Sequence, residues 1–297
     1  MCDDLTESDN ARWLANQPLT RRSFTRLGAG GAILAALPGC MAKQTHEAAN
    51  GLATVSGTVT IPTPDGKADA FFVHPAKGRH PAVILWPDIA GLREAYRAMG
   101  TRLASAGYAV LVVNQYYRSS PAPILTTMAE WRTPEGQAKI SPMITAITSD
   151  GIERDATAFA SWLDQQGEVD QNRKIATLGY CMTGPFTLRT AAALPERIGA
   201  ACSFHGANMV GATADSPHLL MPRIRAAVLI AIAQNDDERD PQAKDILRRA
   251  ADAAGVRAEV EVYPAQHGWC TLDSPVYDET QAERVWGRML ATLSGNL

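Results

Sequence analysis

Cysteine is scarce in this chain, and its few copies are scattered. Five cysteines occur among 297 residues, none in a CxxC pair and none at the spacing of a zinc site. Two lie within the first 40 residues, which leaves Cys181, Cys202 and Cys270 for the folded part. An odd number does not indicate a disulfide framework, and we expect neither a metal ion nor a cofactor.

The chain also lacks a large excess of charge of either sign. The net charge is −3 at pH 7 and the sequence has no basic stripe, which argues against nucleic-acid binding. Internal repeats and low-complexity tracts are absent from the sequence. With 46% hydrophobic and 20% charged residues, the composition is that of a globular protein, and its length suits one α/β domain preceded by a leader.

Residues 1–41 have the features of an export signal. Arg21 and Arg22 precede Phe24, and residues 27–37 form a weakly hydrophobic run of Gly, Ala, Ile and Leu. This order is typical of a twin-arginine signal, and the run is shorter than the about 20 apolar residues of a transmembrane helix. We therefore expect export to the periplasm by the twin-arginine (Tat) machinery; a retained anchor or a chance apolar segment are the alternatives.

Cys40 ends the segment Leu37-Pro38-Gly39-Cys40, which resembles a lipobox. Lipidation there would attach the protein to a membrane, and without it we expect no membrane contact. Residues 42–54 are mainly polar and suit a tether between the leader and a hydrolase-like domain at 55–297.

Short apolar runs alternate with amphipathic segments after residue 55. Residues 55–61 and 68–73 flank the turn Pro64-Asp65-Gly66 and predict a β-hairpin. Further strands are expected at 82–86, 108–113, 175–178, 200–204, 226–233 and 257–263, and helices at 93–106, 144–165, 186–194, 241–254 and 281–293. The proline-rich stretch 119–142 is expected to be irregular and lid-like. The alternation predicts an α/β fold with a central, mostly parallel sheet flanked by helices.

One segment of the chain has the pattern of a nucleophile elbow. Gly179-Tyr180-Cys181-Met182-Thr183-Gly184 lies between an apolar strand and a helix, as in an α/β-hydrolase, with cysteine in place of the usual serine. Thr183 replaces the second glycine of the simple pattern, and Gly184 follows one residue later. The alternative for Cys181 is a buried, inert thiol.

A cysteine nucleophile needs a base and an acid that orients the base. In this fold the acid follows the nucleophile along the chain, and Asp236 directly follows the strand at 226–233. Asp237 and Asp240 are neighbours that could exchange roles with it, and a loop or helix-cap aspartate is the structural alternative.

The expected base is His267, which follows the last strand. His205 and His218 are competitors, but both precede Asp236, against the order of the fold. His205 ends the strand at 200–204, so it is instead a candidate to line the substrate pocket.

The oxyanion hole needs two backbone N–H groups. Met182, after the nucleophile, and Ile89, in the loop after strand 82–86, are the candidates. Asp88 in the same loop is expected to face the nucleophile, where it either bonds the resting thiol or caps the next helix.

The region from about residue 55 to the C-terminus resembles the dienelactone hydrolase family of α/β-hydrolases. The resemblance is carried by residues 88–91, 114–118, 179–184, 233–236 and 267–269. It implies a Cys181-Asp236-His267 triad. It also implies a glutamate that keeps the thiol dormant, a place held here by the shorter Asp88.

The resemblance further implies two arginines that clamp a substrate carboxylate. Arg118 matches the first, and Thr271 stands where the second belongs. Tyr116 and Trp269 are candidates for an apolar wall, or equally for the core, and Arg118 is otherwise a solvated charge. We expect hydrolysis of an ester or lactone through a thioacyl-enzyme. The alternatives are a general carboxylesterase without lactone preference and a degenerate, exported binding protein.

Overall fold

The computed structural model describes residues 4–15, 44–46 and 51–297. The arginine pair, the apolar run and Cys40 of the expected signal lie outside these residues. Within the described chain no helix combines the length and the hydropathy needed to cross a bilayer.

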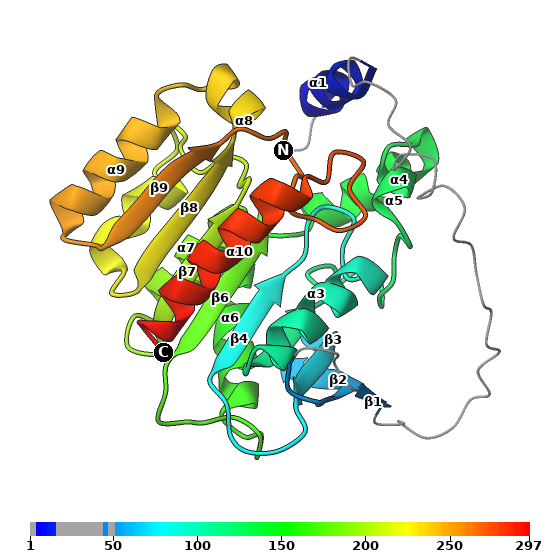
Figure 1. The fold of residues 1–297 in the computed structure, drawn as a ribbon, viewed down its shortest axis with the longest axis vertical. Helices are drawn as coiled ribbons and strands as arrows, with labels where there is room; N and C mark the ends of the chain where they lie inside the picture. Colours follow the sequence, from blue (N-terminus) through cyan, green and yellow to red (C-terminus); the bar gives the residue numbers. More distant parts are fainter. Residues whose placement is uncertain (1–3, 16–43, 47–50) are drawn as a thin grey trace.

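A single sheet runs through the centre of the protein (Figure 1). In the described residues it has nine strands in the order β1-β2-β3-β5-β4-β6-β7-β8-β9. The strands are β1 (Gln44–His46), β2 (Thr54–Thr63), β3 (Gly66–Pro75), β4 (Ala82–Trp86), β5 (Ala109–Val113), β6 (Ile175–Tyr180), β7 (Ile198–Phe204), β8 (Ala227–Ala233) and β9 (Ala258–Tyr263). Neighbouring strands are parallel along the run β5-β4-β6-β7-β8-β9. The strands β2 and β3 form the predicted antiparallel hairpin. The predicted fold class is therefore confirmed.

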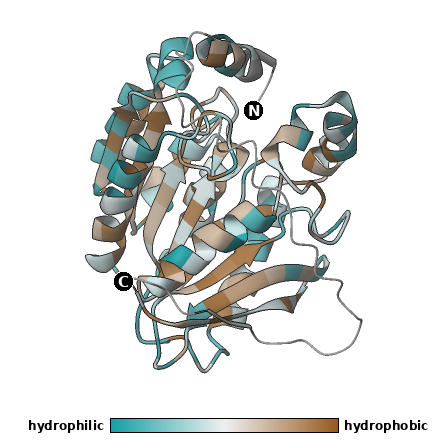
Figure 2. Ribbon diagram, turned by 45° about the vertical axis from the view of Figure 1, so that its right-hand side comes forward, coloured by the Kyte–Doolittle hydropathy of each residue, from teal (hydrophilic) through white to brown (hydrophobic). Residues whose placement is uncertain are grey.

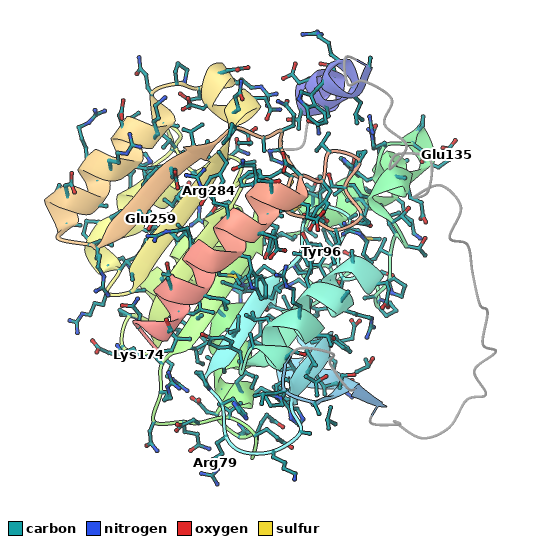
Figure 3. The ribbon with its side chains drawn as sticks, viewed as in Figure 1. Arg79, Tyr96, Glu135, Lys174, Glu259 and Arg284 are labelled. Carbon is teal, nitrogen blue, oxygen red and sulfur yellow. The ribbon has the colours of Figure 1, made fainter. Side chains whose placement is uncertain are left out.

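Helices cover both faces of the sheet, because its central strands are apolar on both sides. The helices α3 (Glu94–Ser105) and α10 (Glu279–Ser294) pack on one face, and α6 (Ser149–Leu163), α7 (Gly184–Ala193) and α9 (Ala243–Ala254) pack on the other. Figure 2 shows the apolar colour in the central strands and mixed colours on the covering helices. In Figure 3 the side chain of Tyr96 from α3 lies within the body of the protein, whereas those of Arg79 and Glu135 extend from its periphery.

The stretch 119–142, expected to be irregular, is partly helical. It contains α4 (Met128–Trp131) and most of α5 (Pro134–Thr145). Pro134 lies at the start of α5, where its missing N–H costs nothing, and Thr133 Oγ1 caps the helix by accepting from the Gly136 N–H at 3.1 Å. The single helix expected at 144–165 is therefore the end of α5, a short break, and α6.

Three short elements complete the described chain. These are the 3₁₀ turns η1 (Cys181–Thr183) and η2 (Pro217–Arg223) and the helix α8 (Gln234–Arg239). The helix α1 (Asp4–Ala15) lies beside α8, and it belongs to residues 1–41, which the sequence predicts to be an export signal.

Candidate active site

The predicted triad residues come together at the carboxyl edge of the sheet. Cys181 follows β6, Asp236 lies in α8 directly after β8, and His267 lies in the loop after β9. Because these strands are parallel members of one sheet, their C-terminal ends lie at the same edge of it. Asp88 reaches the same edge from the end of β4.

The turn around Cys181 is tight. The φ angle of Cys181 is 56°, which lies in the left-handed region. This backbone conformation is unfavourable for a residue other than glycine, so surrounding contacts must stabilise it. A Cβ at Gly179 would lie 2.2 Å from the carbonyl oxygen of Thr183, and one at Gly184 would lie 2.4 Å from Gly206 Cα. Glycine is therefore required on both sides of the nucleophile by close packing.

Thr183, which replaces the elbow glycine, stabilises this turn. Its buried hydroxyl accepts a hydrogen bond from the Tyr180 N–H at 2.9 Å, and the carbonyl oxygens of Trp86 and Tyr180, each 2.9 Å away, are the acceptors for its single proton. Thr183 thereby ties η1 to both β6 and β4.

Asp236 and His267 are directly paired. His267 Nδ1 lies 2.7 Å from Asp236 Oδ2, and the backbone N–H of His267 donates to Asn235 Oδ1 at 2.8 Å. The competing Asp237 is held by Lys244 at 2.6 Å. The competing His218 bonds Ser216 instead, at 2.8 Å. Asp236 and His267 are thus paired with each other, whereas Asp237 and His218 have other partners.

His267 is electrostatically coupled to Cys181. Burial of the imidazole favours its neutral form, but the Asp236 carboxylate, the charge of Cys181 and hydrogen bonds with both residues outweigh burial and raise the pKa of His267 to about 10. The ring therefore tends to hold a proton, as the partner of a thiolate would.

His205 lies behind His267 rather than lining an open pocket. Its side chain is 1% exposed, and its ring packs edge to face against the rings of His267, at 4.8 Å, and Trp269, at 5.3 Å. Its Nδ1 is 3.6 Å from Cys270 Sγ. Burial, with a contribution from His267, lowers the pKa of His205 well below its usual range, so the ring stays neutral.

The Asp88 carboxylate is bonded to Arg93. Both of its oxygens accept from Arg93, at 2.6 and 2.9 Å, and Oδ1 also accepts from the Ala90 N–H at 3.0 Å. Burial raises the pKa of Asp88, Arg93 opposes the rise, and the charge of Cys181 adds to it. Asp88 is thus close enough to Cys181 for their charges to interact.

Arg93 is the site residue that the sequence did not reveal. Its side chain is 0% exposed, and beyond Asp88 it donates to both oxygens of Asp273, at 2.7 and 2.8 Å. Thr271, at the position expected for the second arginine, is buried and lies 3.5 Å from the Tyr96 hydroxyl. The only sequence signal for Arg93 was its place five residues after Asp88, at the start of a predicted helix.

The two expected oxyanion donors lie in the loop after β4 and in the turn after β6. Tyr116 links them, because its hydroxyl lies 2.8 Å from the Ile89 carbonyl oxygen and 3.2 Å from Met182 Sδ. In the described loops no backbone hydrogen bond uses the Ile89 N–H. This amide therefore remains a candidate donor to a bound oxyanion.

Arg118 and Trp269 are both engaged in contacts within the domain. Arg118 bonds Asp65 at 2.6 Å and Asp155 at 2.8 Å, and thereby connects the β2–β3 hairpin to α6. Trp269 is 0% exposed and stacks on Tyr263 in the core. Among the residues that the structure describes, no group of three or more His, Cys, Asp or Glu side chains is arranged to hold a metal ion.

The helix α1 contacts the back of the site. Asn10 Nδ2 donates to the carbonyl oxygen of His267 at 3.1 Å. Arg239 of α8 donates to Thr6 Oγ1 at 3.0 Å and to Asp9 Oδ2 at 2.8 Å, and it lies 3.9 Å from Asp236.

A strained turn between a parallel strand and a helix, with an acid and a histidine after later strands, defines the α/β-hydrolase class. The model of the dienelactone hydrolase family matches residues 68–297. The chain belongs to this family and is a dienelactone hydrolase-like hydrolase.

Curated relatives agree with this assignment, and a solved structure shares the fold. A carboxymethylenebutenolidase homologue of Escherichia coli K12 is 28% identical over 244 residues, 80% of this chain and 86% of its own. A homologue of Methylorubrum extorquens AM1 is 27% identical over 294 residues, 95% of each chain. A dienelactone hydrolase homologue of Klebsiella pneumoniae has the same fold, with a TM-score of 0.70 and 24% identity over 81% of this chain and 98% of its own.

Proposed function

We propose that this protein hydrolyses a carboxylic ester or lactone with Cys181 as the nucleophile. The observation that carries the proposal is the 2.7 Å bond between Asp236 and a His267 ring whose charge is coupled to Cys181. The carboxymethylenebutenolidase homologues make a lactone one candidate substrate.

The proposed reaction has two halves. His267 holds the proton given up by the Cys181 thiol, as its raised pKa favours, and the thiolate attacks the substrate carbonyl carbon. Met182 and Ile89 N–H groups stabilise the oxyanion, each donor contributing about 2.7–4 kcal/mol. The C–O bond then breaks, the departing oxygen takes the proton from His267, and a thioester remains on Cys181.

In the second half, His267 removes a proton from water as the water attacks the thioester. Collapse of the tetrahedral intermediate breaks the C–S bond and releases the carboxylic acid, and the proton held by His267 returns to the Cys181 sulfur to regenerate the thiol. Asp236 holds the imidazole in orientation throughout. We propose that the Asp88 carboxylate disfavours the resting thiolate, because two negative charges so close together repel.

Cys181→Ala tests the proposal against cleavage of p-nitrophenyl butyrate. The variant should lose at least about a thousandfold in kcat/KM while its melting temperature stays close to that of the wild type. Cys202→Ala is a matched control, since that thiol is buried in the core. Undiminished hydrolysis by the Cys181 variant would refute the cysteine mechanism.

The degenerate binding protein remains the alternative from another class. A thiol whose pKa is lowered reacts quickly with iodoacetamide at neutral pH, whereas an inert buried thiol does not. Slow labelling of Cys181 together with no ester hydrolysis would favour that alternative. A general carboxylesterase would cleave neutral esters and lactones at similar rates.

We propose further that residues 1–41 direct export to the periplasm through the Tat machinery, and the lipobox-like segment makes Cys40 a candidate for lipidation. Replacement of Arg21 and Arg22 by lysine should leave the protein in the cytoplasm, as measured by cell fractionation. Equal export of the variant would contradict this. Cys40→Ala should release the exported protein from the membrane fraction if Cys40 carries a lipid.

A further inference from the structure

We infer that this site accepts esters with an uncharged, apolar acyl group and discriminates against substrates that carry a carboxylate. The inference rests on the proposed function and names its substrate class. It departs from the carboxylate clamp that the family resemblance implied.

The arginine nearest the nucleophile loop is already neutralised. Arg93 uses Nε, Nη1 and Nη2 in bonds to Asp88 and Asp273, and it is fully buried. A substrate carboxylate could reach this guanidinium only by displacing one of the two aspartates. The displaced aspartate would then lose its partner, and for Asp88 this would happen in the protein interior.

Arg118, to which the resemblance assigned the carboxylate clamp, and Arg189, which lines the cleft beside Met182, are also paired. Arg118 bonds Asp65 and Asp155 and stacks on the Tyr117 ring, with its centre 4.6 Å from the ring centroid. Arg189 donates to the Asp215 carbonyl oxygen at 2.7 Å and to its carboxylate at 3.1 Å. None of these three arginines offers an uncompensated positive charge to a substrate anion.

Two carboxylates, Asp88 and Asp273, share the single guanidinium of Arg93, so this cluster has the wrong net charge for an anionic substrate. Asp88 is buried, and its charge and that of Cys181 interact. A carboxylate close to Cys181 would meet this negative charge in surroundings from which water is largely excluded.

The surroundings of Cys181 are instead apolar. The thiol belongs to a hydrophobic cluster formed largely by the loop after β4 and by the segment that contains α4 and α5. Its buried members are Ile89, Ala90, Tyr116, Ile124, Leu125, Met128, Trp131, Ile140 and Cys181. Such a wall favours an alkyl or aryl group over a charged one, because burying an unpaired charge is costly.

A cleft adjoins this wall on the side of Met182. Its volume is about 440 Å³, and Ile144, Ile147, Pro185 and Phe186 are among its lining residues. This volume falls within the range of small-ligand sites. The charged pair Arg189–Asp215 also lines this cleft. The cleft therefore offers an apolar group space next to the elbow without an unpaired cation.

The test compares p-nitrophenyl butyrate with the p-nitrophenyl monoester of succinic acid, which carries a terminal carboxylate on a chain of the same length. We expect kcat/KM for the butyrate to exceed that for the succinate monoester by at least about tenfold. Equal or preferred cleavage of the anionic ester would overturn the inference while leaving the ester hydrolase intact.

A second readout does not need turnover. Alkylation of Cys181, measured on its peptide by mass spectrometry, should be faster with iodoacetamide than with iodoacetate, by a larger ratio than for glutathione. A ratio no larger than that of glutathione would overturn the inference even in a protein that cleaves no ester. Loss of all ester cleavage would instead count against the proposed function.

Two variants shift the charge balance in known directions. Asp273→Asn removes one carboxylate from Arg93. It should lower the butyrate-to-succinate ratio of kcat/KM and the iodoacetamide-to-iodoacetate ratio of alkylation rates by about threefold or more. Ile144→Lys should lower the same two ratios by adding a cation to the cleft. Ile144→Gln controls for polarity at the same position, and Asp245→Asn on the exposed side of α9 controls for net charge. Ratios unchanged by both charge variants would contradict the electrostatic basis of the inference.

Discussion

The imidazole ring of His205 meets the ring of His267 edge to face, with 4.8 Å between their centroids and 69° between their planes. One ring stays neutral because it is buried, and the other has a pKa raised to about 10. The neutral ring of His205 therefore packs against the side of the His267 ring and limits its rotation, while Asp236 bonds Nδ1 of His267.

His205→Asn should isolate the contribution of this ring. His205 has a φ of 39°, a conformation that asparagine tolerates, so the backbone should keep its path. We expect kcat/KM to fall about tenfold, mainly in kcat, because His267 gains freedom to leave its orientation. Steady-state kinetics with p-nitrophenyl butyrate would measure this. Unchanged kinetics would mean that the His205 ring does not help to position the base.

The pH dependence should report the raised pKa of His267. Protonated His267 is needed to protonate the leaving oxygen, so kcat/KM should fall as the pH rises through about 10. Because the folded pKa lies above the ordinary 6.5, the stability from this pairing is complete below about pH 6.5 and is lost as the pH rises toward 10. In Asp236→Asn the alkaline limb should move to lower pH. An alkaline limb at the same pH in both proteins would argue against the pairing.

Arg93→Met should destabilise the fold. The change leaves Asp88 buried without its cation and removes the link to Asp273. We expect a loss of about 3–5 kcal/mol in the free energy of unfolding, measured by urea denaturation. The double variant with Asp88→Asn should lose clearly less, because no unpaired charge remains. Equal losses in the single and double variants would contradict a buried ion pair.

Thr183→Val should weaken the elbow. Valine has nearly the same shape but leaves the Tyr180 N–H and the Trp86 carbonyl oxygen without this buried partner. The expected cost is about 1–3 kcal/mol. Thr183→Ser, which keeps the hydroxyl, is the matched control and should lose less. A valine variant as stable as the serine variant would show that the hydroxyl bonds contribute little.

Removal of residues 1–41 should leave the triad functional. The truncated chain loses the Asn10 bond to the His267 carbonyl oxygen, but the bonds from Asp236 and Asn235 to His267 come from the domain itself. We expect kcat/KM to stay within about threefold, since one neutral hydrogen bond contributes only about 0.5–1.5 kcal/mol. A loss beyond tenfold would make α1 part of the working site.

The sequence by itself determined the layout of this protein. The alternation of apolar runs with amphipathic segments predicted the order of strands and helices, because hydrophobic periodicity is a local property. The glycines around Cys181, and the positions of Asp236 and His267 after later strands, predicted which side chains would meet, because parallel strands end at a common edge. Proline content misled in the stretch 119–142, where Pro134 begins a helix instead of preventing one.

Only the tertiary structure decided which charges neutralise one another. Arg93 and Asp273 are 180 residues apart in the chain, and Arg118 and Asp155 are 37 apart. No local pattern encodes such pairs, because they arise when elements pack and water leaves. The same packing placed His205 behind the base and made Thr183 a tie between two strands. Long-range burial and ion pairing, rather than sequence spacing, therefore set the electrostatic character of the site.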